Sequence, residues 1–201
     1  MKNNKGVLVI VSGPSGAGKS TVVFKAMSGR TDCCFSTSVT TRSPRPGETD
    51  GKEYFFIDRA RFDEMVERDE LLEHAVYVNN CYGTPRKYVE DRLAEGLNVI
   101  LDIEVQGARQ IAAKVPGSVK IFVVPPSLEE LERRLIHRGT DTPEAIAGRL
   151  ERARQEYREA GIYDYIIVND DPDIAAAELN AIILAEHCRA ADRAHYLIIS
   201  E

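Results

Sequence analysis

GPSGAGKS, residues 13–20, is the stretch that decides the fold of this chain. It matches the phosphate-loop pattern G-x-x-x-x-G-K-[ST] at every fixed position. The β-branched apolar run Val7–Val11 before it predicts a buried parallel strand, and the apolar spacing of residues 21–27 predicts a helix after it. The motif therefore lies between a strand and a helix, where its mechanism requires it, which argues against a chance glycine-rich turn.

The residue types of this loop suit a nucleoside triphosphate. Glycines let backbone N–H groups turn inward around phosphate oxygens, and the start of the following helix adds a partial positive charge. Lys19 is expected to reach the β- and γ-phosphates, and the Ser20 hydroxyl to bind Mg²⁺. The expected ATP-binding residues of the loop are Gly13, Pro14, Ser15, Gly16, Ala17, Gly18, Lys19 and Ser20.

Composition narrows the range of partners. A net charge of −6 argues against a nucleic-acid-binding surface, because such domains are usually basic. The four cysteines form no C-x-x-C pair and indicate reduced thiols. The first five residues leave no room for a signal peptide, and no apolar run approaches a membrane span. We expect a cytoplasmic protein without nucleic-acid or membrane partners, and a homo-oligomer stays open.

Strand patterns alternate with helix patterns along most of the chain, which predicts an α/β fold with a parallel sheet covered on both faces. Two stretches interrupt the alternation. We expect one domain, 1–201, with a phosphate-loop kinase core, an inserted mixed α/β subdomain that binds a nucleoside monophosphate, and a helical lid. The respective ranges are 1–35, 96–125 and 161–201 for the core, about 36–95 for the subdomain and about 126–160 for the lid.

Local sequence patterns predict the type and the ends of several single elements. Asp58 is the expected N-cap of a helix in the inserted subdomain. Strands are expected at 53–57 and 71–78, and a turn at Tyr82–Pro85. The helix that begins near Asp173 and passes His187 has a simple amphipathic pattern.

Asp102 ends the buried strand pattern of residues 98–102. The carboxyl ends of strands in an open parallel sheet face the ligand crevice. Asp102 can therefore point at Mg²⁺ or at the acceptor, as the second acidic site of phosphate-loop enzymes does. The other interpretation is a helix N-cap aspartate.

The acceptor must be recognised elsewhere in the chain. Arg42 and Arg45 lie in a proline- and glycine-rich loop, with Tyr54 and Tyr82 in the same subdomain. Two guanidinium groups and two phenol hydroxyls suit a phosphate monoester dianion. The alternative is that both arginines simply face solvent.

Guanine offers adjacent N1–H and N2–H₂ donors beside the acceptor O6. Glu73, at an otherwise apolar strand position, could accept from the donors, and the hydroxyls of Ser38 and Thr84 could donate to O6. Taken singly, each of these side chains is more often structural.

Seven arginines lie on the helix pair of the second interruption. Some have glutamates at i,i+4 spacing, which indicates solvated ion pairs, Glu156 being among those glutamates. The others would clamp the transferring phosphoryl group from a closing lid. Spacing alone does not identify which arginines these are.

Taken together, the motifs from Gly6 to Glu186 resemble guanylate kinases of the bacterial type. The segments that carry the resemblance are 12–21, 35–48, 51–56, 82–84, 100–107, 134–139, 149–150 and 167–170. The resemblance implies transfer of a phosphoryl group from ATP to GMP with Mg²⁺. The pattern differs at Glu104, where many members have aspartate, and it assigns no role to Glu104 or to residues 189–201.

The resemblance also implies roles for single residues. It assigns the guanine to Ser38, Glu73 and Thr84, and the GMP phosphate to Arg42, Arg45, Tyr54 and Tyr82. Glu48 would orient the arginine loop, Asp102 would face GMP and contact the metal indirectly, and Asn169 would lie near the adenine. The lid and catalytic arginines would be Arg134, Arg138 and Arg149, acting with Lys19.

Two other functions compete with this one. A non-catalytic interaction module of the same fold typically has a degraded phosphate loop, whereas Lys19, Ser20 and Asp102 are all present here. A kinase for another nucleoside monophosphate, such as AMP or dTMP, is disfavoured by Glu73 with its neighbouring hydroxyls.

Overall fold

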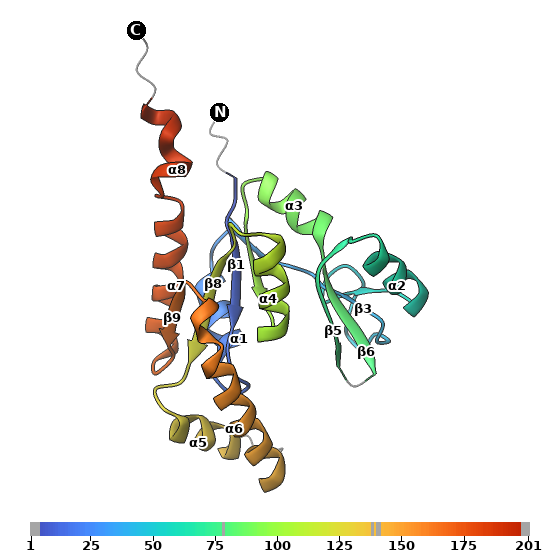
Figure 1. The fold of residues 1–201 in the computed structure, drawn as a ribbon, viewed down its shortest axis with the longest axis vertical. Helices are drawn as coiled ribbons and strands as arrows, with labels where there is room; N and C mark the ends of the chain where they lie inside the picture. Colours follow the sequence, from blue (N-terminus) through green and yellow to red (C-terminus); the bar gives the residue numbers. More distant parts are fainter. Residues whose placement is uncertain (1–4, 78, 138, 140–141, 198–201) are drawn as a thin grey trace.

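The computed structural model describes residues 5–77, 79–137, 139 and 142–197. It confirms the predicted α/β class (Figure 1), because it contains a five-stranded parallel sheet and a separate four-stranded mixed sheet. None of the helices in the described ranges is long and apolar enough to cross a membrane.

The parallel sheet carries the phosphate loop at its centre. Its strand order is β2-β7-β1-β8-β9, and every neighbouring pair is parallel. Val11 of β1 is in register with Asp102 of β7, so the loop that follows β1 begins beside Asp102. The strands are β1 Leu8–Ser12, β2 Cys33–Phe35, β7 Asn98–Asp102, β8 Val119–Val124 and β9 Tyr165–Val168.

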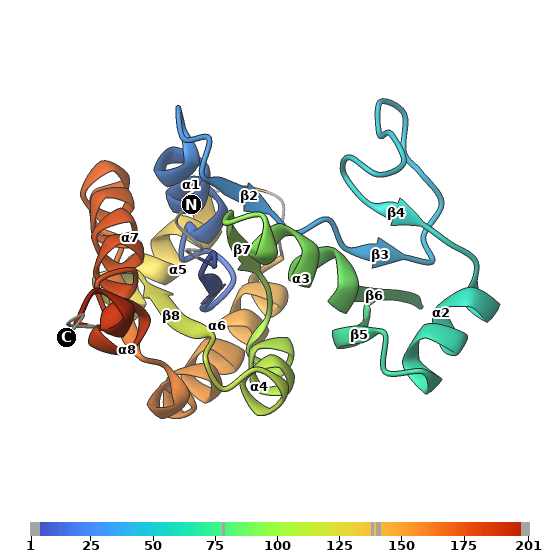
Figure 2. The same cartoon turned by 90° about the horizontal axis from the view of Figure 1, so that it is seen from above.

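Helices cover both faces of this sheet, as Figure 2 shows from above. Alternate residues of β1 point to opposite faces. Val9 and Val11 pack with helices α1 (Lys19–Met27) and α7 (Pro172–Glu186) on one face. Leu8 and Ile10 pack with α3 (Arg86–Ala94) and α4 (Val105–Lys114) on the other. All five residues of β1 are buried, which explains its uninterrupted apolar pattern.

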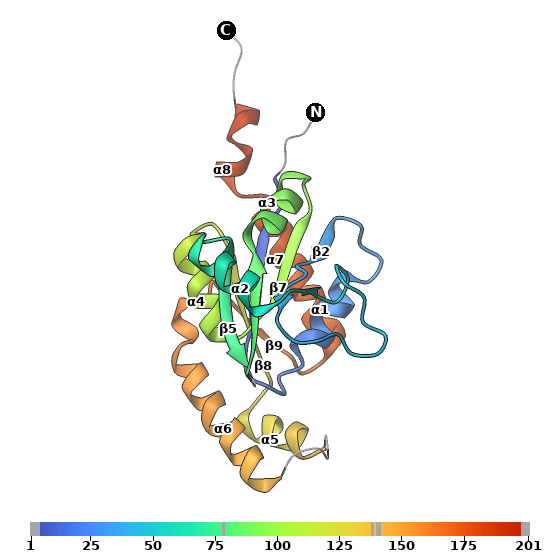
Figure 3. The same cartoon turned by 90° about the vertical axis from the view of Figure 1, so that its right-hand side faces the viewer.

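The mixed sheet lies to one side of the parallel sheet (Figures 1 and 2), in front of it in the view of Figure 3, and packs against α2 (Arg59–Glu67). Its strand order is β4-β3-β6-β5. Asp58 caps α2 as predicted, accepting a hydrogen bond from the Arg61 amide at 2.7 Å. The strands are β3 Val39–Thr40, β4 Phe55–Phe56, β5 Leu71–Tyr77 and β6 Asn80–Pro85.

The turn predicted at Tyr82–Pro85 is wrong, because these residues belong to β6, which pairs antiparallel with both β3 and β5. Gly83 is needed for a different reason, the close packing of β6 against β5. A Cβ at that position would lie 2.8 Å from the Leu71 side chain and 3.0 Å from the Glu73 carbonyl oxygen. The glycine therefore permits close approach of β5 and β6. The expected strand at 53–57 is also shorter, spanning Phe55–Phe56.

A helix pair, α5 (Leu128–His137) and α6 (Pro143–Arg158), projects beyond the carboxyl ends of the parallel strands (Figure 1). It has a small core of its own, made by Leu131, Leu135, Leu150 and Ala153. The Ser127 hydroxyl accepts from the Glu130 amide at 3.1 Å and so caps the start of α5. The remaining elements are the short helices η1 Ala160–Ile162, α8 Ala190–Arg193 and η2 Ala194–Leu197.

Candidate active site

The phosphate loop depends on glycine at three positions. Gly13, Gly16 and Gly18 have φ values of 141°, 96° and 86°, which side chains with a Cβ rarely adopt. A Cβ on Gly13 would lie 2.1 Å from the Val123 carbonyl oxygen, and one on Gly18 would lie 2.4 Å from the Asn169 amide nitrogen. The loop is therefore packed tightly between β8 and the end of β9.

Lys19 and Ser20 open helix α1 beside Asp102. The Lys19 ammonium donates to the carbonyl oxygens of Gly13 at 2.7 Å and Pro14 at 3.3 Å, so it lies over the loop. The Ser20 hydroxyl donates to Asp102 Oδ2 at 2.7 Å. Asp102 is not the N-cap of α4, because Glu104 occupies that position. The helix-cap interpretation of Asp102 is therefore wrong, and its carboxylate faces the phosphate loop.

The donors at this point suit a hard divalent cation that is shared with a nucleotide. A hydroxyl and a carboxylate lie within one hydrogen bond of each other. Mg²⁺ is usually held by one or two such groups plus substrate phosphates and water. Within the described residues no group of three or more His, Cys, Asp or Glu side chains could hold a metal ion. The pair of Ser20 and Asp102 fits a metal that arrives with the nucleotide.

Asn169, at the end of β9, forms hydrogen bonds with both the phosphate loop and helix α5. It is 2% exposed, and its side-chain amide donates to the Ala17 carbonyl of the phosphate loop at 2.7 Å. The backbone carbonyl oxygen of Asn169 accepts a hydrogen bond from the Arg134 guanidinium of α5 at 2.9 Å. Asn169 Oδ1 has no hydrogen-bond partner among the described residues. The predicted adenine-side residue thus lies against the loop and against a predicted lid arginine.

The arginine loop is organised by Glu48. This carboxylate accepts from the Arg42 guanidinium at 2.8 and 3.0 Å and from the Arg45 backbone amide at 2.7 Å. The hydrogen bond from Arg42 holds the pKa of Glu48 below its ordinary value, so the carboxylate stays ionised. Arg42 is accordingly not a solvent-facing side chain, since 13% of it is exposed. The Arg45 residue, by contrast, is exposed.

Two tyrosines lie beside Arg42. Its guanidinium carbon lies 5.4 Å from the ring centre of Tyr54, and the rings of Tyr54 and Tyr82 meet edge to face at 6.0 Å. The structure therefore brings together a guanidinium and two phenols that the sequence analysis assigned to one phosphate. The Arg45 side chain belongs to the same loop but makes no ion pair among the described residues.

Glu73 is a buried acid on β5. It is 6% exposed, and Thr84 of β6 donates to its Oε1 at 2.7 Å. Burial raises the pKa of Glu73, and the Thr84 hydrogen bond opposes that rise. A Cβ on Gly107 would lie 2.9 Å from Oε2, so this glycine leaves space at the second carboxylate oxygen. The half-buried Ser38 lies on the approach to β3, and its hydroxyl makes no hydrogen bond among the described residues.

The helix pair presents two of the predicted arginines to the loop. Arg149 of α6 donates to the Ser15 hydroxyl at 3.1 Å. Arg134 of α5 pairs with Glu130 at 2.7 Å and also reaches the Asn169 carbonyl. Leu131 and Leu135 pack against Gly16. Arg138 lies outside the described residues.

Sequence reasoning missed a chain of charges on α6. Arg152 donates to Glu104 in the core at 2.8 Å and to Glu156 at 3.1 Å. The interpretation of Glu156 as a solvated partner is wrong, because 13% of its side chain is exposed and its Oε2 has no partner among the described residues. Burial raises the pKa of Glu156. One available signal was spacing, since Glu156 follows the buried Ala153 by three residues.

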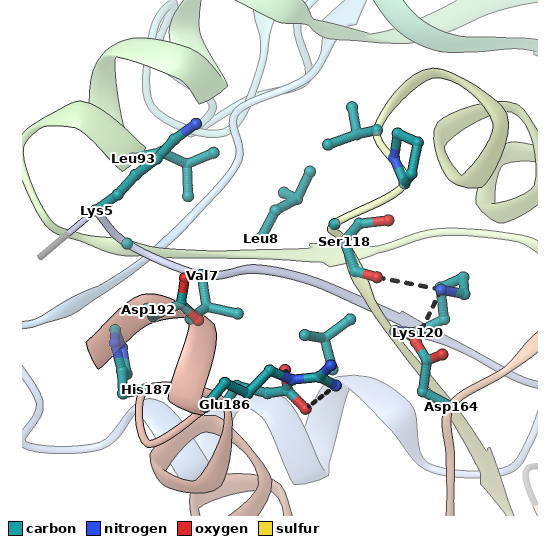
Figure 4. Close-up of a pocket in the computed structure, with 16 residues that line it drawn as sticks. Lys5, Val7, Leu8, Leu93, Ser118, Lys120, Asp164, Glu186, His187 and Asp192 are labelled. Carbon is teal, nitrogen blue, oxygen red and sulfur yellow. Dashed lines mark hydrogen bonds and ion pairs between the residues drawn. The ribbon is translucent and has the colours of Figure 1, made fainter. Parts of the chain in front are cut away.

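A separate cavity of about 450 Å³ lies at the amino-terminal ends of β1 and β8, opposite the phosphate loop (Figure 4). Val7, Leu8 and Ser118 are among its lining residues. Its charged groups largely neutralise one another, as Lys120 pairs with Asp164 at 2.8 Å and Arg189 with Glu186 at 2.5 Å. It shares no residue with the site at the carboxyl ends of the strands.

Proteins of known identity resemble this chain in sequence and in fold. The family model for guanylate kinase matches residues 5–186. The guanylate kinase of Lactococcus lactis subsp. lactis is 51% identical over 185 residues, covering 92% of this chain and 90% of that protein. That of Thermus thermophilus is 50% identical over 190 residues, covering 94% and 85%. The crystal structure of guanylate kinase from Anaplasma phagocytophilum has a TM-score of 0.72 at 37% identity, covering 94% of this chain and 90% of that one.

Proposed function

The chain belongs to the guanylate kinase family, and from this premise we propose how its residues carry out the transfer of the γ-phosphoryl group from ATP to GMP. The protein is an ATP-dependent nucleoside monophosphate kinase that forms ADP and GDP. The observation that carries the residue assignment is the buried Glu73–Thr84 pair in a protein with an intact phosphate loop. A buried carboxylate requires a partner for its charge, and guanine offers two adjacent donors.

On the donor side, the backbone of residues 13–20 surrounds the ATP phosphates. Lys19 neutralises charge on the β- and γ-phosphates, and Asn169 borders the adenine. Arg134, Arg138 and Arg149 complete the neutralisation from the lid. Members of this family generally need a divalent metal with ATP. Mg²⁺ would be held by Ser20 and, less directly, by Asp102, where it would offset phosphate charge.

On the acceptor side, Arg42, Arg45, Tyr54 and Tyr82 bind the GMP phosphate, and Glu48 holds the arginine loop in position. Glu73 accepts from guanine N1–H and N2–H₂. A hydroxyl carries one hydrogen, and that of Thr84 already donates to Glu73 at 2.7 Å. Thr84 therefore orients Glu73, which leaves Ser38 to donate to O6.

No general base is required, because the acceptor phosphate oxygen is already ionised at neutral pH. Catalysis consists of positioning two anions in line and neutralising the charge between them. Closure of residues about 36–95 and about 126–160 over the core would exclude water, which otherwise competes for the γ-phosphoryl group.

The unpaired thiols of the described cysteines support a reducing compartment, and we assign the enzyme to the cytoplasm on that basis.

A coupled assay of ADP formation tests this proposal, with GMP, dGMP, AMP and UMP as acceptors in the presence of ATP and Mg²⁺. We expect GMP to be phosphorylated with a kcat/KM at least about a hundredfold above that for AMP, since a site built to accept hydrogen bonds from guanine N1–H and N2–H₂ rejects analogues that lack these donors. Equal use of AMP would contradict the assignment of Glu73. Failure of a folded protein to phosphorylate any of the four would contradict the catalytic function itself.

The raised pKa of Glu73 also determines how the stability of the folded protein depends on pH. Its folded-state pKa is raised, so the folded protein holds this proton more tightly than the unfolded chain does, and stability is lost as the pH rises through that pKa. Glu73→Gln removes the buried charge while keeping an acceptor for Thr84. We expect this variant to have a melting temperature a few degrees higher than the wild type at pH 7, because ~1 kcal/mol corresponds to about 2–4 °C at this size.

The difference in melting temperature should shrink as the pH falls through about 4.3, the ordinary pKa of glutamate, because below it the carboxyl group becomes protonated in the unfolded state as well. Thermal unfolding of both proteins across this pH range measures it without nucleotide. A Glu73→Gln variant that melts lower than the wild type at pH 7 would contradict the inferred burial of an ionised carboxylate.

The Arg152–Glu104 pair connects the lid helix α6 to the core next to Asp102. Both side chains are more than half exposed, so the pair is worth at most ~1 kcal/mol, or about fivefold in kcat/KM. We expect Arg152→Ala and Glu104→Gln each to lower kcat/KM for GMP by a small factor. The double variant should have a kcat/KM no lower than that of the less active single variant, because both changes break the same ion pair. Multiplicative losses in this double-mutant cycle would show that the two residues act separately.

A further inference from the structure

The strand that carries Glu73 is irregular at that residue. In the antiparallel pairing of β5 with β6, Leu71 lies opposite Pro85 and His74 lies opposite Gly83, so two residues of β5 face one residue of β6. This arrangement is a β-bulge, and bulges beside binding sites change the direction in which a side chain points. The direction of the Glu73 carboxylate therefore depends on a local departure from regular strand geometry.

The bulge directs two consecutive side chains toward the same helix. Leu72 belongs to the buried cluster that contains Ala108 and Ile111 of α4. Glu73 also faces α4, because a Cβ on Gly107 would lie 2.9 Å from its Oε2. In a regular strand neighbouring side chains point to opposite faces, so one of the two would face away from α4. The bulge therefore accounts for the position of the carboxylate beside this helix.

Helix α4 holds the backbone on both sides of the bulge. The Gln110 side chain exchanges two hydrogen bonds with His74, accepting from its amide at 3.1 Å and donating to its carbonyl oxygen at 3.0 Å. The Lys114 ammonium donates to the Leu71 carbonyl oxygen at 2.8 Å. Gly107, Gln110 and Lys114 are spaced by three and four residues, so they share one face of the helix. One helix face thus contacts the bulge and the backbone before and after it.

Helix α4 belongs to the core, whereas β5 belongs to the inserted subdomain. It stands between β1 and β5 (Figure 1) and begins just after β7, whose last residue, Asp102, accepts a hydrogen bond from Ser20. In the sheets of the described chain β5 is an edge strand. Gln110 supplies to His74 the pair of hydrogen bonds that a neighbouring strand would otherwise make. The bulge is therefore held in place relative to the phosphate-loop side of the protein.

We propose that Gln110 is a positioning residue for guanine recognition, which keeps the β5 bulge in the geometry that points Glu73 at the base. The inference rests on the proposed role of Glu73 as the acceptor for guanine N1–H and N2–H₂. Gln110 acts through the backbone of His74 and not by contact with the nucleotide. Hydrogen bonds weaken steeply when their geometry is distorted, so release of the bulge weakens GMP binding. AMP lacks both donors, and its binding is unaffected.

Calorimetric binding of GMP and AMP to Gln110→Met measures this effect. Methionine keeps the length of the side chain and a similar helix propensity, but it cannot donate to the His74 carbonyl oxygen. We expect the affinity for GMP to fall about tenfold and that for AMP to stay within about twofold, because a small misplacement of a binding group is costly. Gln106→Met, at an exposed position of the same helix, is the matched control and should bind both nucleotides like the wild type.

A second variant and a double-mutant cycle separate positioning from a general loss of structure. Gln110→Ala removes both hydrogen bonds and should narrow the ratio of GMP to AMP affinity by a similar factor. If Gln110 acts through Glu73, adding Gln110→Met to Glu73→Ala should not change this ratio further. A loosened subdomain would instead weaken both nucleotides, because they share the phosphate site. Circular dichroism establishes which variants are folded.

Three results would overturn the proposal: an unchanged ratio in the folded Gln110 variants, equal losses of GMP and AMP affinity, or a further change of the ratio in the double variant. The same series distinguishes this failure from failure of the proposed function. An unchanged ratio in Glu73→Ala would refute the guanine assignment itself, and the positioning role with it. A ratio that narrows in Glu73→Ala but not in Gln110→Met or Gln110→Ala would refute the positioning role alone.

Discussion

Lys19→Met is expected to lower kcat by about a thousandfold while leaving the affinity for GMP nearly unchanged, since removing one preorganised charge-stabilising group typically costs a factor of 10²–10³. The Lys19 ammonium lies over the phosphate loop, bonded to the carbonyl oxygens of Gly13 and Pro14. Those carbonyls keep it at the position where β- and γ-phosphates are expected. Charge develops there during transfer, whereas GMP is bound by other residues.

Steady-state kinetics and calorimetric binding of GMP measure the two effects separately. Lys25→Met is the matched control, because Lys25 lies on the same helix and its ammonium pairs with Asp173 at the surface. We expect this control to retain the wild-type kcat. If Lys19→Met weakened GMP binding as much as it lowered kcat, Lys19 would instead be needed to keep the loop and its surroundings folded.

Glu73→Ala is expected to weaken GMP binding by about a hundredfold or more and to narrow the gap between GMP and AMP. Two hydrogen bonds to an ionised acceptor are lost, each worth ~1.5–3 kcal/mol. AMP lacks both donors, so its binding should change little or improve once the buried carboxylate is gone. The expected signature is therefore a change in the ratio of the two affinities.

A second buried acid supplies the control for this prediction. Glu186 is also 6% exposed, but it lies at the end of α7 and accepts from Tyr165 at 2.7 Å, in the wall of the opposite cavity. Glu186→Ala should lower stability without altering the ratio of GMP to AMP binding. If Glu73→Ala left that ratio unchanged, the assignment of the guanine reader would be wrong.

The parts of the structure that sequence predicted well are those governed by local pattern or by topology. The apolar run of β1 and the loop after it identified the core. The rule that parallel strands present their carboxyl ends at one edge predicted that Asp102 would face the loop, although Ser20 and Asp102 are 82 residues apart. The cap at Asp58 followed from residue type alone.

The failures have physical causes that local pattern cannot express. Gly83 and Pro85 looked like turn residues, but Gly83 is required by the closeness of a neighbouring strand, which only tertiary structure reveals. Glu156 had the spacing of a surface ion pair, yet the packing of α6 buries it. Arg152 and Glu104 are 48 residues apart and carry no motif that links them. The simple amphipathic pattern predicted for the helix that begins near Asp173 is wrong for its outer face, where Ile174 and Leu184 are exposed.

Calorimetric titration of GMP into the enzyme without ATP tests the central assignment, purine recognition by a buried acid, most directly. The predicted result is saturable binding of one GMP per chain, with AMP at least about a hundredfold weaker, in keeping with the hydrogen bonds at stake. Binding of AMP as tight as that of GMP, by protein shown to be folded, would contradict it.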